Sequence, residues 1–207
     1  MFGYPMKIEK DGLAVVMRGV GKADLDVLVK GFSDFEVARF TAQMAPKTYD
    51  DELEWYEKVR KSTEDVLWII EVNGKAVGVS GLHHLPQPVS GIVIWEKDWW
   101  GKGVAGRAHL GRIHYADKHL NLATIASEVR TVNTASLKAL QRVGYTVWGT
   151  KMWNMFRDGK WLSTYEALWL NPRRVEEFGE ELPEMYKEGV RKARIALAEA
   201  EKWVSFC

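Results

Sequence analysis

Alternating and helical patterns of apolar residues divide most of the chain into strands and helices. Short apolar and β-branched runs predict strands at residues 13–18, 66–72, 75–84, 91–95, 123–132, 145–156 and 160–170. Apolar positions at helical spacing predict helices at residues 24–31, 35–44, 48–61, 104–119 and 135–143. Because hairpins alternate with helical crossovers, the order indicates an α/β fold with a central mixed sheet.

Turn and cap signals support this division. Asn73-Gly74 and Asp158-Gly159 each separate two strand-like runs by two residues, which is typical of β-hairpins. Thr48 followed by Asp51 has the form of a capping box at a helix start. Gly144 stands just after the last of the predicted helices, where glycine often ends a helix.

The C-terminal part of the chain follows a different pattern. Residues 172–203 are polar and helical in tendency, and Ala193, Ala196 and Ala200 recur at helical spacing among charges. We therefore predict a first domain at residues 1–171 and a helical extension at residues 172–207 that docks along one face. Three roles stay open for the extension: it caps the sheet edge, forms a homodimer contact, or covers a substrate groove.

Composition narrows the class of protein. The chain has 207 residues, of which 46% are hydrophobic, enough for the core of one domain with an appendage. A net charge of +1 argues against broad capture of nucleic acid or of an acidic membrane surface. The single cysteine, Cys207, allows no disulfide within the chain. No apolar run approaches the ~20 residues of a membrane span, and no signal peptide precedes the first strand, so we expect a cytoplasmic protein.

The stretch most informative about function is the turn Trp100-Gly101-Lys102-Gly103-Val104-Ala105-Gly106-Arg107, which joins a predicted strand to a predicted helix. The first N–H groups of a helix lack intrahelical partners and the helix dipole is positive there, so the arrangement predicts an anion site. The glycines allow a phosphate to approach the backbone closely, and Lys102 and Arg107 add positive charge. The alternative is a tight turn with a basic rim.

Two common phosphate-binding motifs do not fit this turn. In a P-loop, Ser or Thr follows the lysine, whereas Gly103 follows Lys102. The letters G-x-G-x-x-G occur as Gly101, Gly103 and Gly106, but residues 96–100 separate them from the strand, and a Rossmann turn follows its strand at once. We therefore predict a phosphate cradle of another kind.

Several segments occur together in an order that is typical of one enzyme superfamily. They are Arg18 with Asp24-Leu25, residues 34–40, residues 73–78, residues 99–105, residues 133–140 followed by Val143-Gly144-Tyr145, and Asp158-Gly159-Lys160. In this order, residues 13–170 resemble the GNAT superfamily of acyl-CoA-dependent N-acetyltransferases. Within it, they are most similar to the branch that contains the ribosomal-protein N-terminal acetyltransferases.

The resemblance implies the GNAT fold, a central mixed and twisted sheet flanked by helices, and acetyl-CoA as the co-substrate. It implies that the strands at residues 91–95 and 123–132 separate and admit the pantetheine arm between them. Asn133 and Ser136 would contact that arm or the thioester. The pyrophosphate would be held by Trp100, Gly101, Lys102, Gly103, Val104, Ala105, Gly106 and Arg107.

The implied chemistry is the attack of a neutral amine on a thioester, which needs a proton acceptor, a donor to the carbonyl and a proton for the thiolate. Adjacent strand residues point to opposite faces, so at most one of His83 and His84 enters the cleft, and we choose His84 as the base. A surface histidine is the alternative. Glu128 could receive the proton through water, or be an exposed glutamate paired with a cation. Ser136 could donate to the sulfur, or satisfy backbone N–H groups.

Other residues leave the base and the acid open. Many superfamily members carry a glutamate on the strand before the cradle, whereas this chain has Gly91 near the strand's start and Glu96 late, beside the loop. We expect Tyr145 to pack in the core, with Tyr165 as an open alternative for the acid. The three histidines of the cradle helix stand five residues apart, so we predict no metal site.

These observations predict an N-acetyltransferase that moves an acetyl group from acetyl-CoA to a primary amine by direct attack in a ternary complex. The acceptor would be a small molecule or a peptide, with no nucleic acid and no membrane as partner. If Trp153 and Trp161 face the acceptor groove, the acceptor has an apolar or aromatic part. Two alternatives remain: an inactive acyl-CoA-binding regulatory or assembly module, and a transferase that uses a different acyl donor.

Overall fold

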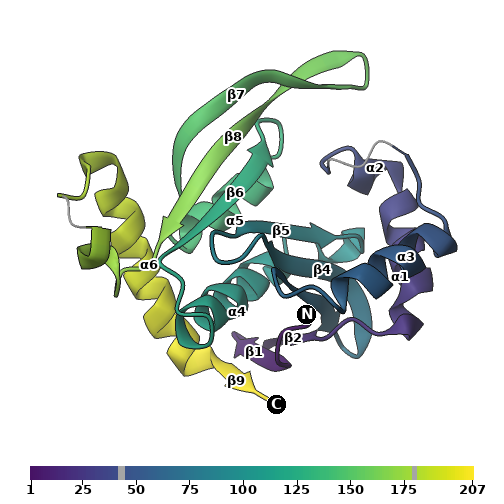
Figure 1. The fold of residues 1–207 in the computed structure, drawn as a ribbon, viewed down its shortest axis with the longest axis horizontal. Helices are drawn as coiled ribbons and strands as arrows, with labels where there is room; N and C mark the ends of the chain where they lie inside the picture. Colours follow the sequence, from purple (N-terminus) through teal and green to yellow (C-terminus); the bar gives the residue numbers. More distant parts are fainter. Residues whose placement is uncertain (42–44, 179–180) are drawn as a thin grey trace.

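The computed structural model describes residues 1–41, 45–178 and 181–207. Within these residues the chain forms one nine-stranded sheet with helices on both faces (Figure 1). The strands are β1 (Met6–Lys10), β2 (Leu13–Arg18), β3 (Asp65–Val72), β4 (Lys75–His83), β5 (Val89–Ile94), β6 (Thr124–Arg130), β7 (Thr146–Arg157), β8 (Lys160–Leu170) and β9 (Val204–Phe206). The α-helices are α1 (Leu25–Ser33), α2 (Phe35–Ala38), α3 (Tyr49–Val59), α4 (Val104–Lys118), α5 (Thr134–Arg142) and α6 (Glu184–Trp203). The predicted α/β fold with a central mixed sheet is confirmed.

The sheet contains one interruption that matters for the site. Its strand order is β7-β8-β6-β5-β4-β3-β2-β1-β9, and among these pairs β5–β6 alone is parallel. β5 and β6 pair at only two positions, Val89↔Ala126 and Ser90↔Ser127. Beyond them the strands separate, and Figure 1 shows β6, β7 and β8 rising away from β5. The expected separation of these two strands is confirmed, and we call it the fork.

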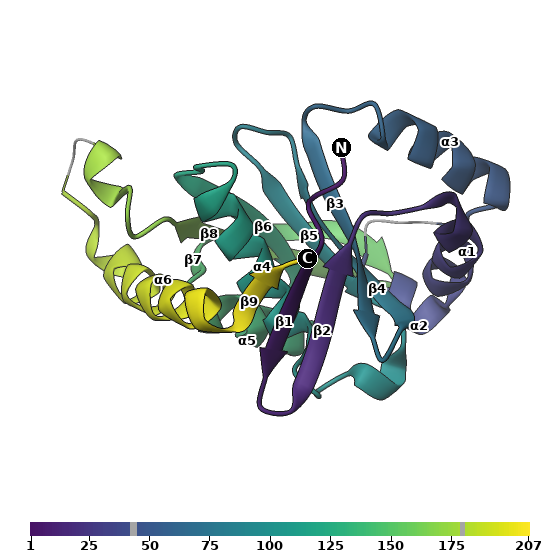
Figure 2. The same cartoon turned by 90° about the horizontal axis from the view of Figure 1, so that it is seen from below.

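Two apolar cores cover the two faces of the sheet. The larger core lies on the face that carries α4, α5 and α6, and includes Trp68, Ile113 and Trp169, which are fully buried. The smaller core lies under α1, α2 and α3, and includes Leu25 and Ile69. Figure 2 shows the two groups of helices on opposite sides of the sheet. The separation matters because each side chain near the fork belongs to one face or the other.

The N-terminal hairpin was missed in the sequence, where the first strand was predicted at residues 13–18. β1 precedes it, and Asp11-Gly12 forms the turn, with both residues at positive φ. Met6 and Ile8 alternate with charged residues and are fully buried. The C-terminal β9 pairs with β1 and so covers the edge of the sheet, the first of the three roles considered for the extension.

The helix boundaries mostly follow the sequence, with one correction. The capping box at Thr48 and Asp51 forms in both directions at the start of α3, as predicted. α2 ends at Ala38, whereas the pattern predicted a helix at residues 35–44. Met44, the predicted end, lies outside the described residues. Asp34 caps α2 through its side chain, which accepts a hydrogen bond from the N–H of Glu36.

The C-terminal helix α6 shares the larger core with the rest of the chain. Ala193 and Leu197 are buried in that core. A Cβ built on Gly189 would lie 2.1 Å from Oγ1 of Thr146, and one built on Gly144 would lie 2.6 Å from Cβ of Ala193. The glycines therefore allow α6 to lie directly against the start of β7. α6 is thus packed as an integral layer on this face.

We expect Gly189→Ala to lower the free energy of unfolding by about 1–3 kcal/mol, because the new methyl group overlaps Thr146. Gly106→Ala is the matched control, since a Cβ there meets no atom within 4 Å and alanine favours the helix. Urea denaturation of both variants measures the difference. Equal stability of the two variants would show that α6 does not rest on this contact.

A buried ion cluster anchors the first helix to the sheet. Two guanidinium nitrogens of Arg18 donate to the two carboxylate oxygens of Asp24 at 2.8 Å, and Nε donates to Oε1 of Glu71 at 2.7 Å. The N–H of Gly21 also donates to Asp24 at 2.8 Å. Burial alone would raise the pKa of Asp24, but these hydrogen bonds and the charge of Arg18 outweigh it, so the pKa lies below its usual value.

We expect Asp24→Asn to cost about 1–3 kcal/mol of stability at pH 7, because it removes a carboxylate that is hydrogen-bonded to a charged group. A lowered carboxyl pKa stabilises the fold above the unfolded pKa of about 3.9, and this contribution disappears as pH falls through the folded value. The gap between wild type and variant should therefore shrink below about pH 4. Asp26→Asn, at an exposed position of α1, is the control. A gap that is constant with pH would contradict the assignment.

Candidate functional site

The turn before α4 forms an open backbone cradle. Gly101 and Gly103 have φ of 74° and 82°, a left-handed conformation that glycine adopts without strain. Gly103 is the N-cap of α4, and the N–H groups of Val104, Ala105 and Gly106 have no backbone acceptor among the described residues. A Cβ built on Gly106 would meet nothing within 4 Å, so the surface is open there. These N–H groups at the positive end of α4 fit a phosphate.

Two side chains of the predicted cradle lie at its rim. The indole N–H of Trp100 donates to the carbonyl oxygen of Ile94 at 2.8 Å, which ties the turn to the end of β5. Lys102 is exposed, and its Nζ lies 5.3 Å from the ring centre of Trp99. The ammonium group of Lys102 therefore stays near the cradle without an ion partner among the described side chains.

Arg107 has a different place from the one that the sequence suggests. Its Nε donates to the carbonyl oxygen of Leu13 at 3.2 Å, and its Nη1 donates to that of Gly103 at 3.2 Å. Its Nη2 donates to the carbonyl oxygen of Lys10. The guanidinium group is therefore engaged with three carbonyls and clamps the start of α4 to the β1–β2 turn. A phosphate contact predicted for Arg107 would compete with this clamp.

The fork leaves backbone groups of β5 without a strand partner. In an antiparallel pair, the backbone N–H and C=O groups of successive residues point alternately toward and away from the neighbouring strand. The N–H of Trp95 donates to the carbonyl oxygen of Val77 on β4, so the backbone groups of Gly91 also point toward β4. Those of Ile92 and Ile94 therefore point away from β4. β6 has already separated at that level. Trp100 satisfies the carbonyl of Ile94, while the N–H of Ile92 has no partner in the described sheet. An amide-bearing chain could therefore bind along β5 here.

On the face that carries α1–α3, two glycines oppose each other beside the fork. Gly81 on β4 pairs with Gly91 on β5, and we call this pair the glycine floor. A Cβ built on Gly81 would lie 2.5 Å from Cδ2 of Leu67 and 2.9 Å from Nε2 of His83, so these two side chains cover Gly81. A Cβ built on Gly91 would meet only Nε2 of His83, at 3.9 Å, so the space above Gly91 is more open. The imidazole of His83 therefore lies over the floor. Paired glycines inside strands are typical of places where a ligand approaches closely.

Of the two adjacent histidines, His83 and not His84 lies over the glycine floor. His84 follows the end of β4 with a φ of 68° and is exposed, so it lies outside the strand. His83 shares a face with Gly81, two residues before it. Nδ1 of His83 lies 2.8 Å from Oδ1 of Asp65, the residue opposite it on β3. The histidine beside the fork is therefore His83, and the choice of His84 as the base stays a prediction.

Glu128 lies across the fork from the glycine floor. It follows Ser127, the last β6 residue paired with β5, and its neighbour Val129 is buried in the larger core, so Glu128 faces the other side. Its Oε1 lies 2.6 Å from Nζ of Lys151, which also lies 3.3 Å from Oε1 of Glu166. Hydrogen bonds to these two carboxylates raise the pKa of Lys151. This is the cation-paired glutamate that the sequence left open as an alternative.

Asn133 and Ser136 begin α5, directly after β6. Oδ1 of Asn133 accepts a hydrogen bond from the N–H of Ser136 at 3.1 Å, so Asn133 is the N-cap of α5. The side chain of Ser136 is partly exposed, and its hydroxyl has no hydrogen bond to the described residues. Asn133 thus has a structural task, whereas the hydroxyl of Ser136 is available to a ligand.

Beneath the floor, on the opposite face, α4 carries a fully buried arginine that sequence reasoning did not single out. Nη1 of Arg112 donates to the carbonyl oxygen of Gly91 at 3.0 Å and to Oγ of Ser80 at 3.2 Å. Its Nη2 lies 2.8 Å from Nδ1 of His109. Burial and then the charge of Arg112 hold the pKa of His109 well below its usual value, so the ring is a neutral acceptor. No described carboxylate forms an ion pair with Arg112.

Hydroxyl groups meet at the base of the fork. Oγ of Ser90 lies 3.2 Å from the hydroxyl oxygen of Tyr145, and Oγ of Ser127 donates to the carbonyl oxygen of Ser90 at 3.4 Å. All three side chains are buried. Tyr145 packs in the core, as expected, and its hydroxyl is used there.

The β7–β8 hairpin closes over the fork from the far side. Figure 1 shows it arching from β6 toward α2. At its tip, Oδ2 of Asp158 lies 3.3 Å from Nη2 of Arg39, just after α2. The arch exposes large apolar side chains, namely Trp148, Met152, Trp153, Phe156 and Trp161. This amount of exposed aromatic surface on one hairpin is typical of a binding surface.

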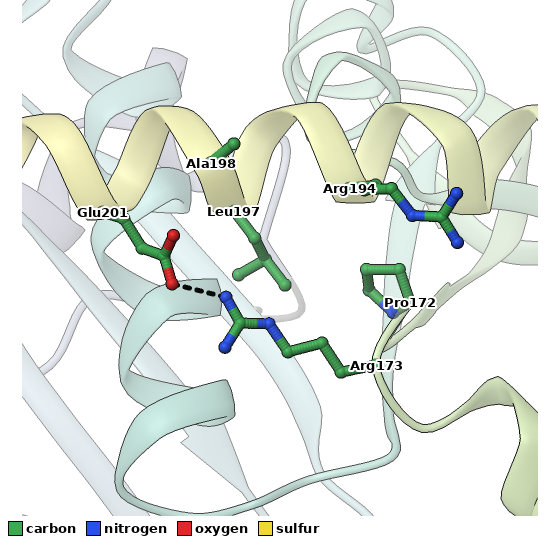
Figure 3. A pocket seen from close by; sticks show the side chains of 6 residues that line it. All are labelled: Pro172, Arg173, Arg194, Leu197, Ala198 and Glu201. Atoms are coloured by element: carbon green, nitrogen blue, oxygen red, sulfur yellow. Dashed lines mark hydrogen bonds and ion pairs between the residues drawn. The ribbon is translucent and has the colours of Figure 1, made fainter.

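A surface pocket beside α6 is unrelated to the cradle. Figure 3 shows Pro172, Arg173, Arg194, Leu197, Ala198 and Glu201 around it, with Arg173 hydrogen-bonded to Glu201. Nη1 of Arg173 also lies 3.4 Å from Oδ2 of Asp117, near the end of α4. The pocket is thus at the other end of α4 from the cradle, about 20 Å away along the helix axis.

Over residues 1–41, 45–178 and 181–207, no three His, Cys, Asp or Glu side chains are grouped as a metal site. In the same part of the chain, no helix has both the length and the apolar character needed to span a bilayer.

Comparison with known proteins gives one family. The family described as "Acetyltransferase (GNAT) domain" matches residues 14–146, more than half of the chain. No curated protein matches the sequence.

Solved structures share the fold at low sequence identity. Spermidine N-acetyltransferase from Vibrio cholerae, in complex with CoA and spermine, is 17% identical with a TM-score of 0.71, over 75% of this chain and 95% of that chain. RimJ from Mycobacterium smegmatis, in complex with CoA-disulfide, is 17% identical with a TM-score of 0.70, over 98% of this chain and 95% of that chain. An N-acetyltransferase from Staphylococcus aureus Mu50 is 20% identical with a TM-score of 0.66, over 75% of this chain and 98% of that chain. The RimJ likeness extends into residues 172–207.

Proposed function

This chain belongs to the GNAT acetyltransferase family, and from that premise we propose that it transfers an acetyl group from acetyl-CoA to a primary amine. The observation that carries the proposal is the fork beside an open backbone cradle. Acetyl-CoA supplies the activated thioester, and the cradle and fork supply its binding groups. The acceptor then attacks directly in a ternary complex.

The cradle fits the pyrophosphate of acetyl-CoA. The N–H groups of Val104, Ala105 and Gly106 are unpaired in the described backbone, and a phosphate oxygen could accept from them. The exposed ammonium of Lys102 adds positive charge at the rim. Arg107 contributes indirectly, because its clamp on the β1–β2 turn holds the helix start in place.

The fork fits the pantetheine arm. The unpaired N–H of Ile92 can donate to an amide or to the thioester carbonyl, as a strand partner would. A backbone donor fixed in a sheet polarises a carbonyl without reorganising during the reaction. The hydroxyl of Ser136 at the start of α5 is the proposed donor to the departing sulfur.

The acceptor would enter on the face of the glycine floor, beneath the β7–β8 arch. Glu128 and Glu166 place two carboxylates around one lysine, Lys151, on this side, and the charge of Glu128 also acts on Arg130. Glu128 is paired with Lys151 and is therefore proposed as an electrostatic guide for the acceptor. The exposed aromatic side chains of the arch favour an acceptor with an apolar or aromatic part.

We expect Gly106→Glu to weaken CoA binding by about 10-fold to 1000-fold, which corresponds to a repulsion of about 1–4 kcal/mol between unit charges at 4 Å. The site is open at Gly106, so the substitution does not require the cradle to shift. Gly106→Gln is the control with the same length and no charge. Isothermal titration with CoA at low and high salt measures the effect.

Binding by wild type that is lost in Gly106→Glu but largely kept in Gly106→Gln would support the cradle. No binding by wild type would overturn the proposal. Binding without turnover of any amine (spermidine, lysine, tryptamine and a short peptide with a free N-terminus as the panel) would favour the non-catalytic binding module. Faster turnover of a longer acyl-CoA than of acetyl-CoA would show that the enzyme uses a different acyl donor.

We expect Trp153→Ala and Trp161→Ala to raise the KM of the accepted amine about 3-fold to 10-fold, since an aromatic contact contributes about 0.5–1.5 kcal/mol. The KM of acetyl-CoA should change less than about twofold, because both residues lie on the arch. Phe178→Ala, an exposed aromatic near α6, is the control. Steady-state kinetics with each substrate varied in turn gives both constants. Equal effects on the two substrates would show that the arch does not select the acceptor.

A further inference from the structure

The histidine over the glycine floor is held in one orientation by a carboxylate. Nδ1 of His83 lies 2.8 Å from Oδ1 of Asp65, and Oγ of Ser62 donates to Oδ2 of Asp65 at 2.6 Å. Burial alone would raise the pKa of Asp65, but the hydrogen bonds from Ser62 and His83 outweigh it and the pKa is lowered. Asp65 is therefore ionised near neutral pH.

This contact decides which imidazole nitrogen is free. An ionised carboxylate only accepts hydrogen bonds, so Nδ1 of His83 carries the proton and donates to Asp65. Nε2 then holds a lone pair. That atom lies over the glycine floor, 3.9 Å from the position that a Cβ of Gly91 would occupy. A lone pair fixed by a hydrogen bond at the other nitrogen is the arrangement of a general base.

The position of the free nitrogen matches the fork. Gly91 is the first β5 residue beyond the last β5–β6 pair, and the next N–H along the strand is the unpaired N–H of Ile92. With the thioester carbonyl held at Ile92, an amine above the floor would lie between the carbonyl carbon and His83. The His83 side chain is 37% exposed, so an acceptor can reach it.

We propose that His83, oriented by Asp65, is the general base that takes a proton from the acceptor amine above the glycine floor. The inference rests on the proposed function and names a catalytic residue for it. His83 touches the acceptor, whereas Asp65 acts through His83 and is a positioning residue.

An acceptor that arrives as an ammonium ion first loses one proton to Nε2 of His83. The neutral amine nitrogen then forms a bond to the thioester carbonyl carbon. The carbon–sulfur bond breaks and its electron pair leaves with the sulfur. The second nitrogen proton passes to the thiolate to give the thiol, and His83 returns its proton to water. No oxidant, metal or covalent enzyme intermediate is needed.

Three other ionisable side chains face His83 or the acceptor. Asp65 lies on β3, the ring of His84 is 6.4 Å away between centres, and Glu128 lies across the fork on β6. Glu128 is already paired with Lys151. These neighbours allow His83 to be tested through the pH dependence of the reaction.

The test compares His83→Gln with the wild type by thiol release from acetyl-CoA. The acceptor is the amine that the panel identifies, with water as the acceptor when no amine reacts. We expect kcat/KM to fall about 100-fold to 10,000-fold, because glutamine cannot accept the proton. In the wild type, kcat/KM should fall at low pH, and we call this fall the acid limb of the pH profile. The acid limb should disappear in His83→Gln, while the CoA affinity measured by titration stays within twofold.

Two further variants separate catalysis from structure. His84→Gln changes the adjacent exposed histidine in the same way and should leave kcat/KM and the acid limb unchanged. Asp65→Asn should lower kcat about tenfold while the CoA affinity stays within twofold, because His83 loses the hydrogen-bond acceptor that orients it. A purely structural role of Asp65 would lower the amount of folded protein and leave kcat per folded molecule unchanged.

Each outcome decides between the two proposals. If the wild type does not bind CoA, the proposed function fails and this inference fails with it. If CoA binds but His83→Gln keeps wild-type turnover and its acid limb, the assignment of His83 is overturned and the proposed function stands. An equal loss in His84→Gln would also overturn the assignment, because the effect would then be a local disturbance.

Discussion

The structure depends on one constraint, the short parallel contact between β5 and β6. β5 is paired with β4 at six positions and β6 with β8 at seven, but β5 and β6 meet at only two. Each strand is therefore held by its outer neighbour, and the sheet can open between them without losing its order. The opening leaves backbone donors and acceptors unpaired inside the fold, which is costly unless another group satisfies them.

The two faces of the sheet differ beside the fork. On the face of α4, a buried arginine without an anion partner supports Gly91 from below, and the hydroxyls of Ser90 and Tyr145 close the base of the fork. A buried guanidinium needs hydrogen bonds in place of water, and the two Nη atoms of Arg112 make them to Ser80, Gly91 and His109, while its Nε has no partner among the described residues. On the other face, Gly81 is covered by Leu67 and His83, whereas a Cβ on Gly91 would meet no atom closer than 3.9 Å, so space remains above Gly91 beside the fork. The support is thus on one side and the open space on the other.

One irregularity decides which histidine belongs to the site. The Asn73-Gly74 turn pairs Val72 with Lys75, and continuing that register would place Asp65 opposite Leu82. A bulge between Ile70 and Glu71 shifts the register by one residue, so that Asp65 lies opposite His83. A shift of one residue gives each side chain a different partner on the neighbouring strand. The His83–Asp65 pair therefore cannot be predicted from the position of the Asn73-Gly74 turn alone.

The sequence by itself determined most of the elements, their order and the cradle turn, because these depend on local signals: apolar periodicity, turn residues, a capping box and glycines at a helix start. It did not predict β1 or β9. The separation of the two central strands was implied by the family resemblance. The tertiary structure decided what each polar side chain does. In the folded chain, Arg107 clamps the start of α4 to the β1–β2 turn, Glu128 forms an ion pair with Lys151, and His83 rather than His84 lies over the glycine floor. These outcomes depend on partners far away in the chain, and such partners become neighbours only when the sheet register and the packing of α4 bring them together.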